Sequence, residues 1–403
     1  MSALIERSDD LEWLKTWREK QIIKVVSGVR RCGKSTLFEI YRKWLSGQGV
    51  EGRQIISINF EDLEYEHLTD YHLLYEYIHK RLVPGKMNYI FLDEIQHVER
   101  YEKAVDSLFL KNNCDIYMTG SNAYFMSGEL ATVLSGRYVE LKMLPLSFRE
   151  FCSAMVGAQL TNAQKFNRYI ENGSFPYIAK FGIESKEAKD YLRDIYHSVL
   201  LKDIVARYKI SDITALENVT KFLLHNIGSR VSPAKIAGML KADGKGTDQK
   251  TVDKYIRGLR DSLMIYEAQR YQLKGRQLLK TNGKYYAVDI GLRNSLVKGS
   301  ESDIGHVLEN IVFLELKRRG YDVYIGQLDE NEIDFVAVDG DSVSYYQVSA
   351  TTLDENTLRR ELAPFDKLRD HYPKYLLTLD DVFGKIDYNG VKKINVLDWL
   401  LER

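Results

Sequence analysis

The sequence predicts an α/β protein with a parallel sheet in its first part, a mostly helical middle part and a second α/β region at its end. Strand-like apolar runs alternate with helical periodicity as far as residue 118, and helical periodicity alone takes over after residue 151. Residues 301–403 then mix both patterns. Because 403 residues exceed one ordinary domain, we expect three domains, over residues 1–150, 151–300 and 301–403.

The first domain is expected to alternate strands with helices. Strands are predicted over residues 22–26, 55–60, 89–92 and 115–118, and helices over residues 37–45, 73–82 and 101–110. This alternation is typical of a parallel sheet covered by helices. In open sheets of this kind, ligands bind where the strands end.

A glycine-rich segment joins the first of these strands to its helix. Residues 28–35 fit the pattern of Gly, four residues, Gly-Lys and Ser or Thr, which forms a phosphate-binding loop. The glycines let backbone N–H groups curl round phosphates, Lys34 reaches the β- and γ-phosphates, and the Ser35 hydroxyl ligates Mg²⁺. The sequence therefore predicts an ATP site with contacts from Gly28, Val29, Arg30, Arg31, Cys32, Gly33, Lys34, Ser35 and Thr36.

Two carboxylates follow the strand predicted over residues 89–92. Asp93 is placed to hold Mg²⁺, and Glu94 is placed to orient and polarise the attacking water. The alternative is an Asp-Glu pair that only caps the following helix. The next strand ends in polar residues, and Ser121 or Asn122 is expected to sense the γ-phosphate.

Composition limits the partners and the compartment. The chain has 57 basic and 57 acidic residues, so its net charge is zero and any DNA-binding surface must be a local patch. Three cysteines without metal-ligand or disulfide spacing fit a reducing cytoplasm, and Cys32 is expected to be a small filler of the loop. No apolar stretch approaches the roughly 20 residues that span a bilayer, so we expect a cytoplasmic protein with no membrane partner.

The nucleotide site carries a wider resemblance. Three features of this site resemble the AAA-type branch of P-loop ATPases: a strand between the loop strand and the acidic strand, a glutamate after the aspartate, and a polar strand end. Residues 28–31, 135–141, 145–151 and 286–293 are similar to a bacterial and archaeal family of AAA-type ATP-binding proteins with a C-terminal domain of unknown function. The resemblance implies that Arg137 is an arginine finger or sensor for the γ-phosphate, in its own or a neighbouring subunit, although a solvated or salt-bridged arginine is the alternative.

The middle domain is predicted to contain a winged helix-turn-helix. Helices are expected over residues 216–227, 233–240 and 248–263, followed by a hairpin over residues 266–278. Ser232 is the expected cap of the second helix, with Pro233 at its first position. The third helix of this fold lies in the major groove of DNA, and its expected buried stripe is Val252, Tyr255, Ile256, Leu259 and Leu263.

Basic residues concentrate on this motif. Residues 241–284 hold eleven basic and five acidic side chains, so we expect DNA contact there. The expected contacts are Lys245, Gln249, Lys250, Lys254, Arg257, Lys274 and Arg276. The alternative is a solvated face on a module that binds protein or serves as an ATPase lid.

The last domain is expected to run helix, three strands, helix and strand. The helix is predicted over residues 306–319 and the strands over residues 323–325, 333–338, 343–348 and 375–378. This order resembles the core of the PD-(D/E)xK nucleases, which hold Mg²⁺ with carboxylates and need a lysine beside the attacking water. The resemblance makes Glu309, Asp334 and Gln347 the site, but Ser349 stands where the lysine belongs. We therefore expect a degenerate nuclease site with lost or weak catalysis.

These features predict an ATP-hydrolysing, DNA-associated AAA-type protein that works as a homo-oligomer on duplex ends or branched DNA. The alternatives are a nucleotide-switched protein-interaction scaffold and an ATP-regulated nuclease. ATP turnover measured with and without DNA distinguishes the DNA-associated ATPase from the scaffold, because DNA should not change the turnover of a scaffold.

Overall fold

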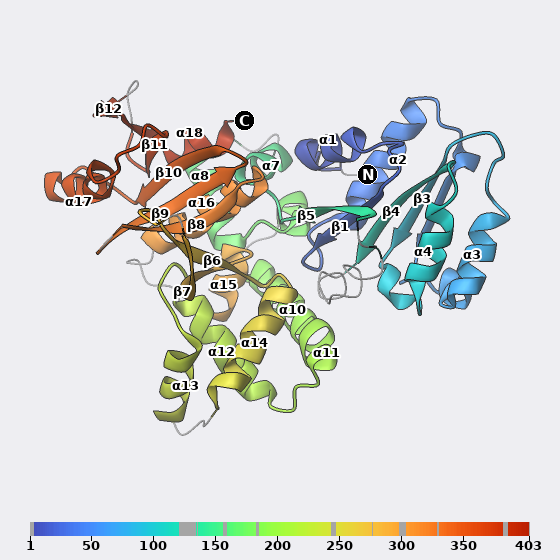
Figure 1. The fold of residues 1–403 in the computed structure, drawn as a ribbon, viewed down its shortest axis with the longest axis horizontal. Coiled ribbons are helices and arrows are strands. Elements are labelled where there is room, and N and C mark those ends of the chain that lie inside the picture. The colour runs from blue at the N-terminus through green and yellow to red at the C-terminus, as the bar shows by residue number, and fades with distance from the viewer. Residues whose placement is uncertain are drawn as a thin grey trace. The chain divides into compact units, whose positions relative to one another are not determined.

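The structure is a computed structural model that describes residues 4–120, 134, 136–155, 159–182, 185–242, 247–275, 277–297, 304–328, 330–381 and 386–402. The chain divides into two compact units, one of residues 1–145 with 261–263 and one of residues 146–260 with 264–403. The expected boundary at residue 150 falls close to this division. The expected boundary at residue 300 lies inside the second unit. Figure 1 shows the elements of both units.

The described strands of the first unit form a five-stranded parallel sheet in the order β2-β3-β4-β1-β5. The strands are β1 (Ile23–Gly28), β2 (Ile55–Asn59), β3 (Asn88–Asp93), β4 (Cys114–Gly120) and β5 (Tyr138–Met143). The helices are α1 (Ser8–Thr16), α2 (Lys34–Gly47), α3 (Tyr71–His79) and α4 (Tyr101–Phe109). The expected strands and helices are confirmed to within a few residues, and β4 lies between the loop strand β1 and the acidic strand β3.

The sheet is buried on both faces because helices cover each of them. Successive side chains of a strand point to opposite faces. On β3, Ile90 and Leu92 join the apolar core that also contains side chains of α3 and α4. Phe91 points the other way, and its ring packs against Phe38 of α2 with 5.2 Å between ring centroids. This two-sided burial explains why β3 reads as a continuous apolar run.

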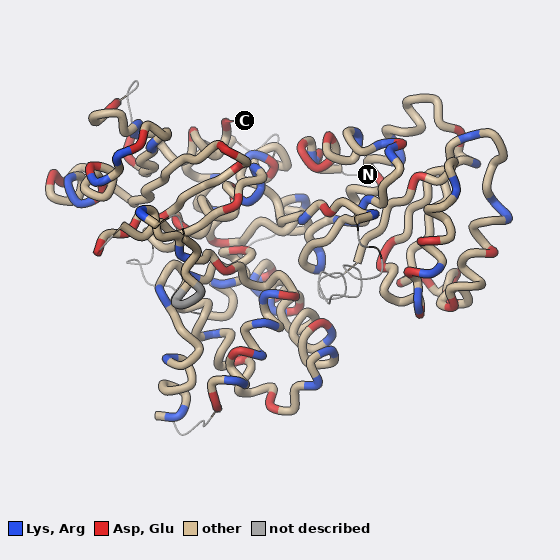
Figure 2. The backbone as a smooth tube through the Cα atoms, in the orientation of Figure 1, with Lys and Arg blue, Asp and Glu red and all other residues tan. Residues whose placement is uncertain are grey.

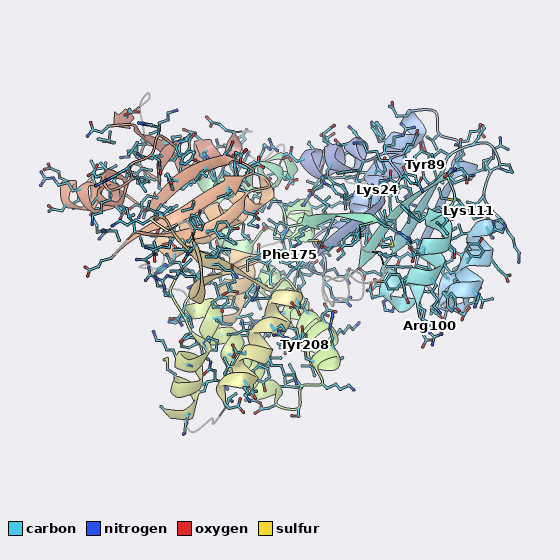
Figure 3. All side chains as sticks on the ribbon, in the orientation of Figure 1. Lys24, Tyr89, Arg100, Lys111, Phe175 and Tyr208 are labelled. Carbon is cyan, nitrogen blue, oxygen red and sulfur yellow. The ribbon has the colours of Figure 1, made fainter. Side chains whose placement is uncertain are left out.

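A buried ion pair lies toward the edge of the sheet where β1 begins, opposite the phosphate-binding loop. The Lys24 ammonium is bonded to Asp115, and both side chains are almost fully buried. Asp115 also accepts hydrogen bonds from Tyr117 Oη at 2.7 Å and from the Glu19 N–H at 2.8 Å. Figure 3 labels Lys24 and Tyr89 in this unit. Because the buried charges are paired and hydrogen-bonded, the arrangement is structural.

The second unit begins with helices. They are α7 (Phe148–Ala154), α8 (Asn162–Asn172), α9 (Pro176–Phe181), α10 (Ser185–Ser198), a π-helical segment (Val199–Val205), α11 (Ala206–Tyr208), α12 (Ile213–His225), α13 (Pro233–Ala242) and α14 (Gln249–Asp261). The expected break at residues 173–176 is confirmed. The Ser232 hydroxyl caps α13 by accepting a bond from the Lys235 N–H at 3.2 Å, and the expected stripe of α14 is buried. Nowhere in the described part of the chain is a helix both long and apolar enough to cross a membrane.

An eight-stranded mixed sheet completes the second unit, in the order β12-β13-β11-β10-β9-β8-β6-β7. Its strands are β6 (Ile265–Gln272), β7 (Gln277–Ala287), β8 (Asp322–Leu328), β9 (Asn331–Asp339), β10 (Ser342–Ser349), β11 (Lys374–Thr378), β12 (Ile386–Tyr388) and β13 (Val391–Asn395). The accompanying helices are α15 (Ile290–Leu296), α16 (Ile304–Arg318), α17 (Glu355–Asp366) and α18 (Val396–Leu401).

The hairpin of β6 and β7 crosses the boundary expected at residue 300, because it belongs to the same sheet as the C-terminal strands. β6 pairs in parallel with β8, so the hairpin and the C-terminal strands share one sheet. An unpaired edge on β6 would expose backbone N–H and C=O groups, and pairing with β8 removes that edge. The sequence pattern also placed the end of the hairpin too early, because β7 continues to Ala287.

Candidate functional site

The loop between β1 and α2 has a backbone shape that its glycines allow. Gly33 has φ 108° and Arg31 has φ 66°, and α2 starts at Lys34. A β-carbon on Gly28 would lie 2.5 Å from the carbonyl oxygen of Met143, so a larger residue would require the backbone to shift. The loop therefore ends at the N-terminus of a long helix, where backbone N–H groups favour an anion.

Lys34, Ser35 and Asp93 lie together at the end of this loop. Lys34 is buried, and its Nζ donates to the Gly28 carbonyl oxygen at 3.1 Å. The Ser35 hydroxyl is hydrogen-bonded to the Asp93 carboxylate. A hydroxyl and a carboxylate are oxygen ligands of the kind that Mg²⁺ prefers, so these two side chains fit the ion that the sequence implies.

Thr119, at the end of β4, connects the two acidic residues. Its hydroxyl donates to Asp93 Oδ1 and accepts a bond from the Glu94 N–H at 3.0 Å. Burial raises the pKa of Asp93, and the hydrogen bonds from Ser35 and Thr119 act against that rise. The sequence marked this strand end as polar but did not assign the link to Thr119. Ser121 and Asn122, which it did select, lie outside the described residues.

Glu94 sits in a left-handed backbone conformation, with φ 55°, directly after β3. One carboxylate oxygen lies 3.7 Å from Lys34 Nζ, and the other accepts a bond from Gln96 Nε2 at 2.5 Å. Gln96 Oε1 is buried, and the described residues offer it no hydrogen-bond partner. Sequence reasoning missed Gln96, whose only signal was a polar side chain two residues after the glutamate.

A cavity of about 330 Å³ opens beside Ser35 and Asp93. Its walls come from α2, from the end of β2 and from the short helix that follows β2, and they include Thr36, Arg42, Asn59 and Tyr65. Polar side chains therefore surround the position next to the expected ion.

The remaining loop residues divide into buried and accessible ones. Val29 and Cys32 are buried, and burial raises the pKa of the Cys32 thiol, as expected of a small filler and not of a reactive group. Arg30 Nη1 lies 3.5 Å from Glu61 Oε1, and Arg31 is exposed.

Arg137 does not reach the nucleotide site of its own chain. It precedes β5, which pairs in parallel with β1 so that Tyr138 lies opposite Ile23 and Met143 opposite Gly28. Arg137 is therefore at the edge where β1 begins, roughly 17 Å of strand away from the loop at about 3.3 Å per residue. Its guanidinium forms a salt bridge with Asp106 at 2.7 Å, as in the salt-bridged alternative considered above. A role of Arg137 in a neighbouring subunit stays a prediction.

The expected DNA contacts on α14 are exposed where they are described. Gln249, Lys250, Lys254 and Arg257 all face solvent, as does Lys274 in the hairpin. Lys245 and Arg276 lie outside the described residues. Acidic residues interrupt this surface, as Figure 2 shows along α12 to α14, and Arg260 is paired with Glu267 at 2.7 Å.

The three residues of the expected nuclease-like site come together at α16, β9 and β10. The Asp334 N–H donates to Gln347 Oε1 at 3.3 Å, and the Val348 N–H donates to Asp334 Oδ2 at 2.9 Å. Burial and the neighbouring Glu309 raise the pKa of Asp334 well above its usual value. Gln347 Nε2 donates to Glu361 at 2.8 Å, so Glu361, an acidic residue that the sequence did not select, is a fourth member of this group.

Lys284 of β7 is a member of the same group. The sequence counted it among the basic residues of the DNA-binding patch, but it is 5% exposed and its ammonium faces Glu309, Glu332 and Asp334. That interpretation was wrong for this residue. Period-two alternation along β7, which places Lys284 and Tyr286 on one face, was the signal that could have identified it.

Comparison with known proteins finds relatives that match most of the chain. Residues 20–152 match an AAA domain, and residues 163–303 match a domain of unknown function, DUF8612. A Haemophilus influenzae protein is 40% identical over 403 residues and covers 99% of both chains. A Methanocaldococcus jannaschii protein is 31% identical over 396 residues, which is 93% of this chain and 85% of the relative. Both relatives are named uncharacterized proteins.

The fold also resembles a solved structure, the Walker-type ATPase of Pyrococcus abyssi. The TM-score is 0.51 at 14% identity, over 72% of this chain and 95% of that chain. At this identity the likeness is evidence for the fold alone. Two relatives match more than nine-tenths of the chain, and residues 20–152 match an AAA domain. The arrangement of the loop and the acidic strand agrees with that match. The chain therefore belongs to the family of AAA-domain proteins that includes the H. influenzae and M. jannaschii relatives.

Proposed function

We propose that the first unit binds ATP with Mg²⁺ and hydrolyses it. The observation that carries this proposal is the meeting of Lys34, Ser35, Asp93 and Glu94 at the ends of β1 and β3. Lys34 would bind the β- and γ-phosphates, while Ser35 and Asp93 would hold Mg²⁺, which neutralises charge on the phosphates. Glu94 would orient and polarise the attacking water.

The position of Glu94 gives this proposal a nucleotide-dependent step. Lys34 Nζ lies 3.7 Å from the Glu94 carboxylate. Phosphate oxygens compete for the same ammonium, so ATP binding would draw Lys34 away and leave the carboxylate oxygen able to accept a proton from water.

The test separates binding from hydrolysis. Lys34→Ala should lose nucleotide binding, whereas Glu94→Gln should bind ATP and hydrolyse it at least about 100-fold more slowly, because a carboxamide is a poor proton acceptor. Fluorescent-nucleotide titration and phosphate release measure the two properties. Equal loss of nucleotide affinity in both variants would remove Glu94 from its role.

We further propose that the helices α12 to α14 and the hairpin contact DNA. Their order is that of a winged helix-turn-helix, and the exposed Lys250, Lys254 and Arg257 support contact with phosphates. Neutralising the three should lower the slope of log affinity against log salt by about one unit per lost contact. Unchanged affinity and slope would favour the protein-interaction scaffold.

Assembly into a homo-oligomer would give Arg137 a function. Its guanidinium lies at the edge of the sheet opposite its own loop, so a nucleotide contact requires another subunit. Mixing Arg137→Ala with Lys34→Ala protein should restore part of the ATPase activity, because some interfaces then combine an intact loop with an intact arginine. Monomers alone in ultracentrifugation with a non-hydrolysable ATP analogue would refute this assignment.

A further inference from the structure

Lys284, on the hairpin strand β7, lies among three carboxylates of the C-terminal elements. Its Nζ is 2.7 Å from Glu332, 3.2 Å from Glu309 and 3.8 Å from Asp334. We call these four residues the lysine–carboxylate cluster. An ammonium group has three N–H donors and no acceptor, so it suits a site whose walls are carboxylate oxygens.

Neighbouring side chains fix the cluster from several directions. Tyr286, two residues along β7, donates to the same Glu309 oxygen at 3.2 Å. Arg230, between α12 and α13, donates to Glu332 at 2.7 Å, and its backbone forms an isolated bridge with Lys284. The cluster therefore connects the helical region, the hairpin, α16 and β9.

The lysine stays charged in this position. Burial alone would lower the pKa of Lys284, but the carboxylates of Glu309, Asp334 and Glu332 raise it above its usual value. The ammonium is thus a permanent cation at neutral pH.

The spacing of the carboxylates suits an ammonium ion better than a metal. Mg²⁺ requires oxygen ligands at about 2.1 Å in near-octahedral geometry. Across the described ranges, and so with this ammonium in place, no group of three or more His, Cys, Asp or Glu side chains is close enough to hold a metal ion. A divalent cation would need the carboxylate oxygens to move inward, into the space that Lys284 Nζ occupies. The carboxylates lie instead around Nζ at hydrogen-bond and ion-pair distances.

We propose that Lys284 is the resident cation of the lysine–carboxylate cluster, that it occupies the place where a hydrolytic metal would have to bind, and that the cluster takes up a divalent cation only when this ammonium is removed. The proposal goes beyond the ATPase and DNA assignments and does not depend on either. If the proposal holds, the nuclease-like arrangement of carboxylates serves to join the hairpin to the rest of the sheet through Lys284.

The test is Mn²⁺ binding, measured by electron paramagnetic resonance on full-length protein. Every sample carries Asp93→Asn, so that the nucleotide site contributes no bound ion. The parent and Lys254→Met, a matched change at an exposed lysine, should bind no Mn²⁺ at the cluster. Lys284→Met should bind about one Mn²⁺ per chain, and a further Asp334→Asn change should abolish that binding.

Thermal unfolding supplies a second readout. Without metal, Lys284→Met should unfold roughly 10 °C below the parent, because Glu309 and Asp334 lose their cation while Glu332 keeps Arg230. Mn²⁺ should recover part of the difference. The unfolding temperature of the parent should not respond to Mn²⁺ or to a chelator.

Three results would overturn the proposal. The first is Mn²⁺ binding by the parent that disappears when Asp334→Asn is added. The second is a Lys284→Met protein that folds but binds no Mn²⁺. If Lys284→Met does not fold, adding Glu309→Gln and Asp334→Asn removes the charges that have lost their cation. Recovery of folded protein then supports the role of Lys284 as a cation, and continued failure to fold is the third refuting result.

Discussion

Thr119 holds both acidic residues of the nucleotide site with one hydroxyl group. It donates to Asp93 and accepts from the Glu94 N–H, and it is fully buried, so water cannot replace either bond. Thr119→Val exchanges the hydroxyl for a methyl group of similar volume. A bond to a charged group contributes about 1.5–3 kcal/mol and a neutral one about 1 kcal/mol, so the free energy of unfolding should fall by about 2–4 kcal/mol.

The larger effect should appear in ATP turnover. Glu94 has a left-handed backbone, and its N–H donates to Thr119. We expect loss of this bond to displace the carboxylate, which then no longer orients the water. We expect kcat to fall by about 100-fold while nucleotide affinity stays within about threefold. Phosphate release and fluorescent-nucleotide titration measure the two quantities.

Thr220→Val is the matched control for this change. Thr220 is also fully buried, and its hydroxyl donates to the Leu216 carbonyl oxygen at 2.8 Å in the second unit. Its loss should cost about 1 kcal/mol of stability and leave turnover unchanged. If Thr119→Val turned ATP over as fast as Thr220→Val, the assigned role of the Thr119 hydroxyl would be refuted.

Three more predictions concern Gln96, Gly28 and the cysteines Cys32 and Cys152. Gln96→Leu should lower kcat by roughly tenfold with KM unchanged, because Gln96 holds the Glu94 carboxylate; a parallel rise in KM would contradict this. Gly28→Ala should lower the free energy of unfolding, measured with denaturant, by about 1–3 kcal/mol, because the added β-carbon is crowded. Gly47→Ala, whose β-carbon would have no atom within 4 Å, should raise it by about 0.5–1 kcal/mol. Equal stabilities of the two variants would contradict the crowding at Gly28. Burial raises the pKa of the Cys32 thiol, and it raises the pKa of the Cys152 thiol to about 11. Alkylation of the native protein at pH 8, followed by mass spectrometry, should therefore be slow at both residues. Rapid alkylation of Cys32 would show that the loop opens.

The sequence was most informative where residue spacing is tied directly to chemistry. The phosphate-binding loop and the acidic strand end could be located because each position has a task that few residue types perform. Ser232 was recognisable as a cap for a similar reason, since a side-chain oxygen before a helix satisfies backbone N–H groups. These features are local, so a single sequence contains them completely.

The features that sequence reasoning missed depend on contacts between distant segments. Periodicity predicts β6 as a strand but says nothing of its pairing with β8. Lys284 reads as one basic residue among several, because its carboxylate partners are provided by α16 and β9. The same limit applies to Arg137, whose distance from its own loop follows from the register of β5 against β1.

The parallel pairing of β6 with β8 has a consequence for how the chain reaches its fold. Arg270 lies opposite Ile325, so the hairpin cannot acquire this neighbour until the following helices and strand have been synthesised. Pairings between distant residues form late and slowly, because a long loop must close first. During synthesis on the ribosome, the helices that we propose to contact DNA would therefore emerge before the C-terminal strands. Until β8 is available, the edge of β6 beside them would stay unpaired.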